Sequence, residues 1–176
     1  MKEFTVSTRP ELSDTGSSRV LAGTLDEAGY TVGDMELSTP AGIAYDLVLS
    51  NTGEAFILTG TVSARVETQC ARCLEPAVLE VEGEVSGYYL ADAGADAEGL
   101  EQDEFSYVAD DGTIDISDAL LAGLFFATPF VILCKDDCKG LCPQCGANLN
   151  EDQGHAHDDE PDPGNPFAVL KNLKLS

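Results

Sequence analysis

The sequence predicts an α+β fold, in which an antiparallel β-rich domain with one or two short helices precedes a cysteine-rich C-terminal module. Three observations support this fold class. Short apolar runs broken by Gly, Asn and Pro dominate residues 1–90, one apolar helical stripe lies near residue 120, and cysteines gather after residue 130. We therefore expect residues 1–129 to form the β-rich domain and residues 130–176 to form the cysteine-rich module with a terminal helix.

Two neighbouring segments, 61–69 and 78–90, alternate apolar and polar side chains with the period of a half-buried strand. The apolar positions are Val62, Ala64, Val66, Leu79, Val81 and Val85. Cys70 and Cys73 lie between the two segments. The sequence therefore predicts an antiparallel hairpin that carries a cysteine pair at its tip.

After this hairpin the pattern predicts a loop and then a helix. Residues 91–104 are small and acidic and read as a mobile loop, and 105–109 and 113–116 read as short extended segments around a turn. Ser117 is the expected N-cap of a helix over 118–127, with Asp118 in its first turn and Pro129 after its end.

The apolar stripe of this helix is expected to pack into the core. Its members are Leu120, Leu121, Leu124 and Phe125. A second short amphipathic helix is expected over 165–175, where a proline stands near its start.

The charge of the chain excludes several classes of function. Nine Lys and Arg stand against 32 Asp and Glu, a formal net charge of −23, and residues 91–118 hold ten acids and no base. Such a chain repels phosphate backbones and anionic lipid surfaces, which disfavours general nucleic-acid or membrane binding. Acidic runs are also typical of plain solvated surface.

The chain shows neither an apolar run of membrane-spanning length nor the apolar core of a secretory signal near its start. We therefore expect a cytoplasmic location. In that compartment, cysteines are more often metal ligands or redox groups than disulfides.

Six cysteines and the only two histidines form four close pairs. They are Cys70 and Cys73, Cys134 and Cys138, Cys142 and Cys145, and His155 and His157. Eight such ligands are enough for two closed tetrahedral zinc sites. Cys142-Pro143-Gln144-Cys145-Gly146 is the sharpest segment, because proline into and glycine out of a C-x2-C turn is typical of a zinc knuckle. The sequence thus predicts about two structural zinc ions.

The spacing leaves the partition of the ligands open. In the preferred partition Cys70 and Cys73 join Cys134 and Cys138, and Cys142 and Cys145 join the two histidines. In the rival partition the last four cysteines share one site, and the first two either join the histidines or stay free of metal. Spacing constrains only neighbouring ligands, so it does not choose between these partitions.

Other interpretations compete with zinc. Cys70 and Cys73 could form a thioredoxin-like redox pair, but such a pair normally opens a helix, and here a strand is expected to follow. His155 and His157 could be surface histidines of an acidic tail. No nucleophile elbow, phosphate-binding glycine loop or H-E-x-x-H motif occurs, so we expect no enzyme activity and assign no catalytic residue.

Several segments, quoted as they stand, carry a family resemblance. They are 70–76 (CARCLEP), 115–116 (DI), 128–129 (TP), 134–150 (CKDDCKGLCPQCGANLN) and 165–170 (NPFAVL). They are similar to the YceD family of bacterial large-ribosomal-RNA-subunit accumulation proteins, whose hairpin tip reads C-x-R-C-L-x-P. The chain departs from the family at His155-Ala156-His157, where many members carry Cys-x-Cys. Imidazole can replace thiolate on zinc, so the exchange agrees with a ligand role.

This resemblance implies a part in 23S ribosomal RNA accumulation and large-subunit biogenesis. Charge favours a basic large-subunit ribosomal protein, or a pre-ribosomal particle, as the partner. The alternative is a zinc-dependent module that contacts ribosomal RNA directly through a small basic spot. The candidates for that spot are Arg65, Arg72, Lys135 and Lys139.

Overall fold

The computed structural model describes residues 3–91, 105–152 and 154–157. The chain divides into two compact units, Met1–Cys138 and Lys139–Ser176, which are considered separately below. The predicted domain boundary between residues 129 and 130 stays a prediction. The mobile loop expected over 91–104, apart from its first residue, and the helix expected over 165–175 lie outside the described residues.

The first unit is built from β-strands and one helix. A seven-stranded sheet contains β2 to β8, and β1 and β9 form a separate antiparallel pair. The strands are β1 (Thr5–Ser7), β2 (Ser18–Leu25), β3 (Gly29–Val32), β4 (Met35–Ser38), β5 (Ile43–Asn51), β6 (Ala55–Gln69), β7 (Pro76–Leu90), β8 (Ser106–Tyr107) and β9 (Thr113–Asp115). All pairings among these strands are antiparallel except that of β7 with β8. The predicted β-rich, antiparallel fold class is confirmed.

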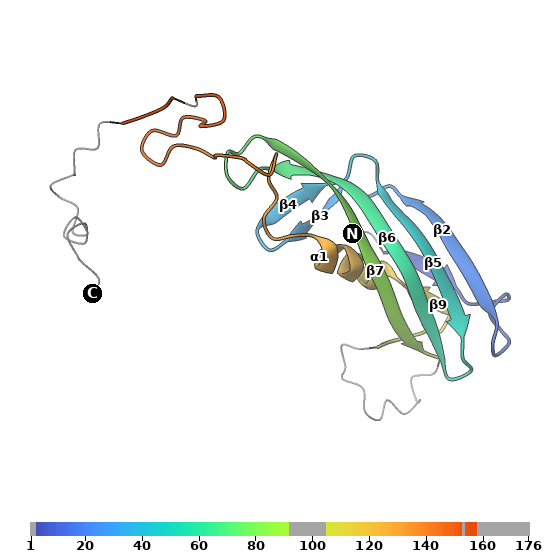
Figure 1. The fold of residues 1–176 in the computed structure, drawn as a ribbon. Coiled ribbons are helices and arrows are strands. Elements are labelled where there is room, and N and C mark those ends of the chain that lie inside the picture. The colour runs from blue at the N-terminus through green and yellow to red at the C-terminus, as the bar shows by residue number, and fades with distance from the viewer. Residues whose placement is uncertain (1–2, 92–104, 153, 158–176) are drawn as a thin grey trace, which may run out of the picture. The chain divides into compact units, whose positions relative to one another are not determined.

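The sheet is organised around β6, which pairs with β5 and β4 on one side and with β7 on the other. Figure 1 shows β6 and β7 running side by side as a long ribbon. Their predicted alternation is confirmed, since Val62, Val66, Val81 and Val85 are buried while Glu82 and Glu84 between them are exposed. Both strands extend further than predicted, and Cys70 and Cys73 lie in the turn that joins them.

The helix α1 (Ser117–Ala127) begins one residue earlier than predicted and is capped differently. Ile116 occupies the N-cap position and makes no side-chain cap, so the expected Ser117 N-cap is wrong. The Ser117 hydroxyl instead accepts the Phe4 N–H at 2.7 Å, while the Asp115 carboxylate accepts the Ser117 N–H at 2.9 Å. The Asp115 carboxylate therefore accepts a helix N–H, which is the role predicted for Ser117. The Ser117 hydroxyl instead links the start of the helix to the residue before β1.

Two glycines bring α1 unusually close to β7. A Cβ at Gly83 would overlap the carbonyl oxygen of Gly123, so the two backbones touch where neither residue has a side chain. Leu120 and Leu124 are fully buried beside this contact, as predicted, but Phe125 is 37% exposed. The buried face of the helix thus includes Gly123 rather than Phe125, because the helix packs on β7 through its glycine, where the two backbones can approach closely.

Thr128 ends the helix immediately before Pro129, as the sequence predicts. Its hydroxyl lies 2.8 Å from the Tyr30 hydroxyl of β3 and donates to the Leu124 carbonyl at 2.7 Å. These bonds fix the direction in which the chain leaves α1. Among the described residues, no helix has the length and apolarity needed to cross a membrane.

Candidate metal centres

Four cysteine sulfurs of the first unit gather at the tip of the β6–β7 hairpin. We call Cys70, Cys73, Cys134 and Cys138 the hairpin cluster; their sulfurs all lie within 4.8 Å of one another. The Cys70 and Cys138 sulfurs are 3.7 Å apart, and those of Cys73 and Cys134 are 3.5 Å apart. Around one ion with metal–sulfur bonds of about 2.3 Å, tetrahedral sulfurs lie about 3.8 Å apart. The four thiols therefore fit a single tetrahedral ion.

One backbone and one side-chain hydrogen bond hold the two halves of the hairpin cluster together. The Ala71 N–H donates to the Ile132 carbonyl at 2.9 Å, and Ile132 is buried. The Arg72 guanidinium donates to the Cys138 carbonyl at 2.8 Å. The segment after α1 is thus attached to the hairpin tip at both ends of residues 132–138, which brings the second cysteine pair onto the first.

The second unit holds the other four candidate ligands. We call Cys142, Cys145, His155 and His157 the terminal cluster; their ligand atoms also lie within 4.8 Å of one another. The Cys142 sulfur is 3.2 Å from His157 Nε2, the Cys145 sulfur is 3.2 Å from His155 Nε2, and the two Nε2 atoms are 2.8 Å apart. A tetrahedral ion bound by two sulfurs and two nitrogens requires separations of about 3.4 to 3.8 Å, so a small outward movement completes the site.

Both clusters use the same backbone turn. In the hairpin cluster the Leu74 N–H donates to the Cys70 carbonyl at 3.0 Å and the Cys70 N–H to the Glu75 carbonyl at 2.8 Å. In the terminal cluster the Gly146 N–H donates to the Cys142 carbonyl at 2.9 Å and the Cys142 N–H to the Ala147 carbonyl at 2.8 Å. The hairpin tip is therefore a knuckle turn of the same kind as the C-P-x-C-G segment.

The residue after each turn's second cysteine has a left-handed backbone. Gly146 has a φ of 75° and Leu74 has a φ of 64°. A leucine in this region costs about 1 to 2 kcal/mol, which glycine avoids. Because leucine stands where the other turn has glycine, the hairpin turn does not match the pattern C-x2-C-G, although the two turns have the same geometry.

The knuckle turns point backbone N–H groups at the first cysteine of each pair. Burial acts to raise the pKa of Cys70, but N–H groups of Arg72, Cys134 and Cys73 outweigh it and lower that pKa to about 6. N–H groups of Cys145 and Gln144 likewise lower the pKa of Cys142 to about 6. Thiolate is the form that binds metal, so each turn prepares one ligand in advance.

Ionisation of one thiol in the hairpin cluster is opposed by its surroundings. Burial and then the neighbouring thiols Cys73, Cys138 and Cys70 raise the pKa of Cys134 to about 12. Full ionisation of the cluster therefore requires a positive charge at its centre, which a metal ion supplies.

Asp152 orients one imidazole of the terminal cluster. Its carboxylate lies 3.3 Å from His155 Nδ1, on the side of the ring opposite the Nε2 that faces the sulfurs. A carboxylate that accepts Nδ1–H fixes the tautomer and leaves Nε2 free to bind metal. Two asparagines shape the loop between the knuckle turn and the histidines. Asn148 Oδ1 accepts the Asn150 N–H at 3.1 Å, and Asn150 Oδ1 accepts the Lys139 N–H at 2.9 Å.

The structure groups the eight sequence-predicted residues as the preferred partition does. Cys70 and Cys73 meet Cys134 and Cys138, and Cys142 and Cys145 meet His155 and His157. Each group could hold one metal ion. Sequence reasoning missed the roles of Asp152 and Leu74. The one signal for Asp152 was its position three residues before a histidine, in a segment already rich in acids.

Asp152→Asn should weaken metal binding at the terminal cluster by roughly 10- to 100-fold, because the loss of a carboxylate that orients a ligating histidine has that effect. The measurement is competition with a chromophoric chelator on the full chain. Glu151→Gln is the matched control, since Glu151 is an exposed neighbour with no contact to either imidazole. If Asp152→Asn and the native chain bind metal with equal affinity, Asp152 does not orient a ligand of the terminal cluster.

Fold and clusters together define a class: a β-rich protein with two groups of four cysteine or histidine side chains, each group built around one knuckle turn. The chain belongs to the YceD family. The family model, described as large ribosomal RNA subunit accumulation protein YceD, matches residues 58–174. That match starts within β6 and includes both clusters.

Relatives from mycobacteria agree with this membership. Uncharacterized proteins of Mycobacterium bovis and Mycobacterium tuberculosis are 36% identical to the chain over 113 residues, which is 64% of this chain and 54% of theirs. An uncharacterized protein of Mycobacterium leprae is 32% identical over 118 residues, 67% of this chain and 54% of its own. The chain thus matches only about half the length of these relatives. No solved structure matches it significantly.

Proposed function

We propose that this protein is a non-enzymatic metal-binding factor in 23S ribosomal RNA accumulation and large ribosomal subunit biogenesis. The observation that carries the proposal is the YceD family match, whose description names large-subunit RNA accumulation. We further propose that it acts in the cytoplasm by binding a basic ribosomal protein or a pre-ribosomal particle.

The two clusters are proposed to hold structural zinc. Sets of four thiolates, or of two thiolates and two imidazoles, in tetrahedral arrangement suit zinc and leave no open position for a water nucleophile. The residues fit such ions by their spacing and by the N–H groups directed at Cys70 and Cys142. Zinc with a complete protein ligand set stabilises folding rather than catalysing a reaction, which supports a non-enzymatic role.

Charge supports a basic protein as the partner. The formal net charge of −23 attracts surfaces rich in Lys and Arg and repels phosphate. A divalent ion bound by four thiolates carries net negative charge, and one bound by two thiolates carries none. Filling the clusters therefore adds no attraction for RNA.

Three of the four basic residues considered for RNA contact are already engaged within the first unit. Arg65 pairs with Glu80 at 3.4 Å, Lys135 lies 4.0 Å from Asp137, and Arg72 donates to the Cys138 carbonyl. Exposed pairs of this kind are weak, yet they reduce the local positive field. This observation favours the basic-protein partner over direct RNA contact.

Native mass spectrometry of protein purified in reducing buffer without chelator should show two zinc ions per chain. Two sets of four ligands are the reason. Cys73→Ser and Cys145→Ser should each lower the count to one. Native chain that carries no metal would overturn the zinc proposal.

Capture from lysate with the immobilised full chain should enrich a basic large-subunit ribosomal protein, and raising the salt concentration should weaken the capture because exposed charges are screened. Fluorescence titration with 23S RNA fragments at two salt concentrations is the parallel measurement, and weak or absent binding is expected.

Tight RNA binding that falls steeply with salt, and that Arg72→Ala, Lys135→Ala and Lys139→Ala together abolish, would contradict the basic-protein partner. It would establish the RNA-binding alternative instead.

A further inference from the structure

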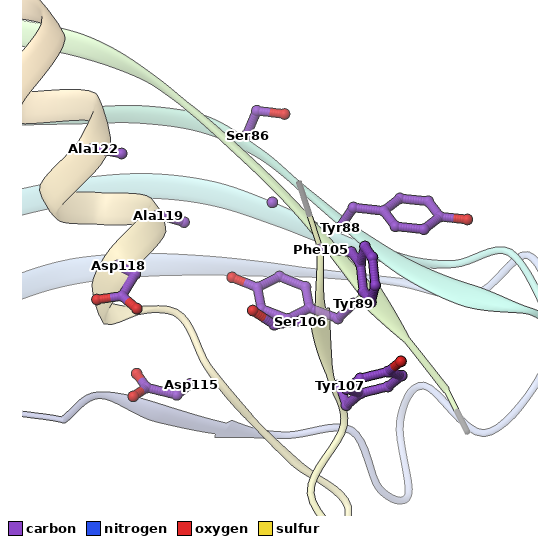
Figure 2. A pocket seen from close by; sticks show the side chains of 11 residues that line it. Ser86, Tyr88, Tyr89, Phe105, Ser106, Tyr107, Asp115, Asp118, Ala119 and Ala122 are labelled. Atoms are coloured by element: carbon purple, nitrogen blue, oxygen red, sulfur yellow. The ribbon is translucent and has the colours of Figure 1, made fainter. Parts of the chain in front are cut away.

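A pocket at the other end of β7 from the hairpin cluster combines aromatic rings with carboxylates. It lies between the end of β7, β8 and the start of α1, and its volume is about 300 Å³. Figure 2 shows it with Asp115 and Asp118 on the helix side and the rings of Tyr89, Phe105 and Tyr107 nearby. We call these five residues the aromatic–acid pocket. Its volume is at the lower end of ligand pockets, which suits one side chain rather than a large molecule.

Tyr89 supplies a polar atom to this pocket that has no partner in the described protein. The residue is only 4% exposed, and its ring folds back over Gly87, where a Cβ would lie 2.8 Å from the hydroxyl. The hydroxyl makes no hydrogen bond to any described residue. Tyr89 lines the pocket, so its hydroxyl is a polar group that the residue offers there. Figure 2 shows it directed toward Asp118.

The two carboxylates give the pocket its charge. Neither Asp115 nor Asp118 forms an ion pair with a Lys or Arg of the described chain. Burial acts to raise the pKa of Asp115, but hydrogen bonds from Ser117 and from the Phe4 N–H outweigh it and keep that pKa low. Two carboxylate charges exceed the roughly half positive charge of a helix N-terminus, so the pocket is negative.

Burial and the same carboxylates keep the Tyr89 hydroxyl protonated. Burial first, and then the charges of Asp115 and Asp118, raise the pKa of Tyr89 to about 12. A neutral hydroxyl beside two carboxylates can accept a hydrogen bond from a cationic donor or give one to a carboxylate.

We propose that the aromatic–acid pocket binds one cationic side chain, preferably arginine, from a basic polypeptide partner. This inference rests on the proposed function and assigns it a contact point. A guanidinium can donate to both carboxylates and to the Tyr89 hydroxyl while its plane stacks on an aromatic ring. Tyr107, which is 45% exposed at the rim, presents such a ring.

The test is an amide-resolved NMR titration of the full chain with N-acetyl-arginine amide. N-acetyl-citrulline amide is the control probe, because it has nearly the same shape but no charge. We expect saturable shifts at residues 86–89, 106–107 and 115–119 with the arginine probe, weaker ones with N-acetyl-lysine amide, and none with citrulline. Equal binding of arginine and citrulline, or shifts confined to other residues, would overturn the proposal.

Variants separate the pocket from the general acidity of the chain. Asp118→Asn should weaken the arginine probe about two- to fivefold, Asp115→Asn with Asp118→Asn roughly tenfold, and Tyr89→Phe about twofold. Asp46→Asn, which removes the same charge from an exposed position on β5, should have no effect. A loss with Asp46→Asn equal to that with Asp118→Asn would show a diffuse field and would contradict the pocket.

Capture of the basic ribosomal protein distinguishes this inference from the proposed function. If the chain with both Asp115→Asn and Asp118→Asn captures the protein as well as the native chain does, the pocket is not a contact point, but the proposed partner is still supported. Arginine binding at the pocket without capture of any basic ribosomal protein would uphold the pocket and contradict the partner.

Discussion

Cys70→Ser is expected to release residues 132–138 from the β6–β7 hairpin and to destabilise the first unit by at least about 3 kcal/mol, since metal binding at a structural site contributes directly to folding. Cys70 is fully buried, so its replacement also leaves three thiols without a complete ligand set. For a chain of this size such a loss lowers the melting temperature by roughly 6 to 12 °C. Thermal unfolding followed by circular dichroism measures it.

Ala71→Ser is the matched control for this experiment. Ala71 is exposed in the same turn and contributes only its N–H to the Ile132 carbonyl, so a serine side chain there should leave the melting temperature unchanged. Chelation of the native chain should reproduce the Cys70→Ser shift. If the melting temperatures of Cys70→Ser and the native chain agree, the hairpin cluster does not stabilise the unit through metal.

Cys142→Ser is expected to unfold the second unit locally while β6 and β7 stay intact. The described part of this unit has few apolar side chains, and its hydrogen bonds join residues at most 15 positions apart. We therefore expect metal ligation to supply most of its folding free energy. Hydrogen exchange should show the Gly146 and Leu149 amides exchanging at least roughly a hundredfold faster, a loss of about 2.7 kcal/mol in protection.

Gln144→Ala serves as the control, because it keeps the backbone N–H that faces Cys142 and removes only an exposed side chain. Its exchange should equal that of the native chain. Unchanged protection of the second unit in Cys142→Ser would mean that its loop folds without the terminal cluster, against the expectation.

Local patterns accounted for much of the first unit. Period-two alternation located the β6–β7 hairpin because one face of each strand is buried, and Pro129 located the end of α1. The pairing of β1 with β9 joins Val6 to Ile114, residues too distant in sequence for any local pattern to connect. The helix cap was misassigned because the serine and the aspartate two residues earlier carry the same capping signal, and only the Phe4 contact separates them.

The candidate ligands were likewise predicted from the sequence, but spacing alone did not choose how they group. Spacing indicates which cysteines share a turn, whereas the meeting of Cys73 with Cys134 depends on where α1 returns the chain. Asp152 and Asp118 were equally hidden, since each stands among many acids and differs from them only by its neighbours in space. Charge patterning indicated the sign of the surface and the acidic stretch over 91–118, but not which of its carboxylates lie beside Tyr89.

The order in which the two clusters can assemble follows from their sequence separations. Paired sulfurs of the hairpin cluster lie 61 and 68 residues apart, whereas paired atoms of the terminal cluster lie 10 and 15 residues apart. Closing the longer loops costs more chain entropy and requires the sheet and α1 to be in place first. During synthesis the four residues of the terminal cluster leave the ribosome after those of the hairpin cluster, but they can assemble without the sheet or α1. A single chain therefore carries one candidate ligand cluster that depends on completed tertiary structure and another that depends on local sequence alone.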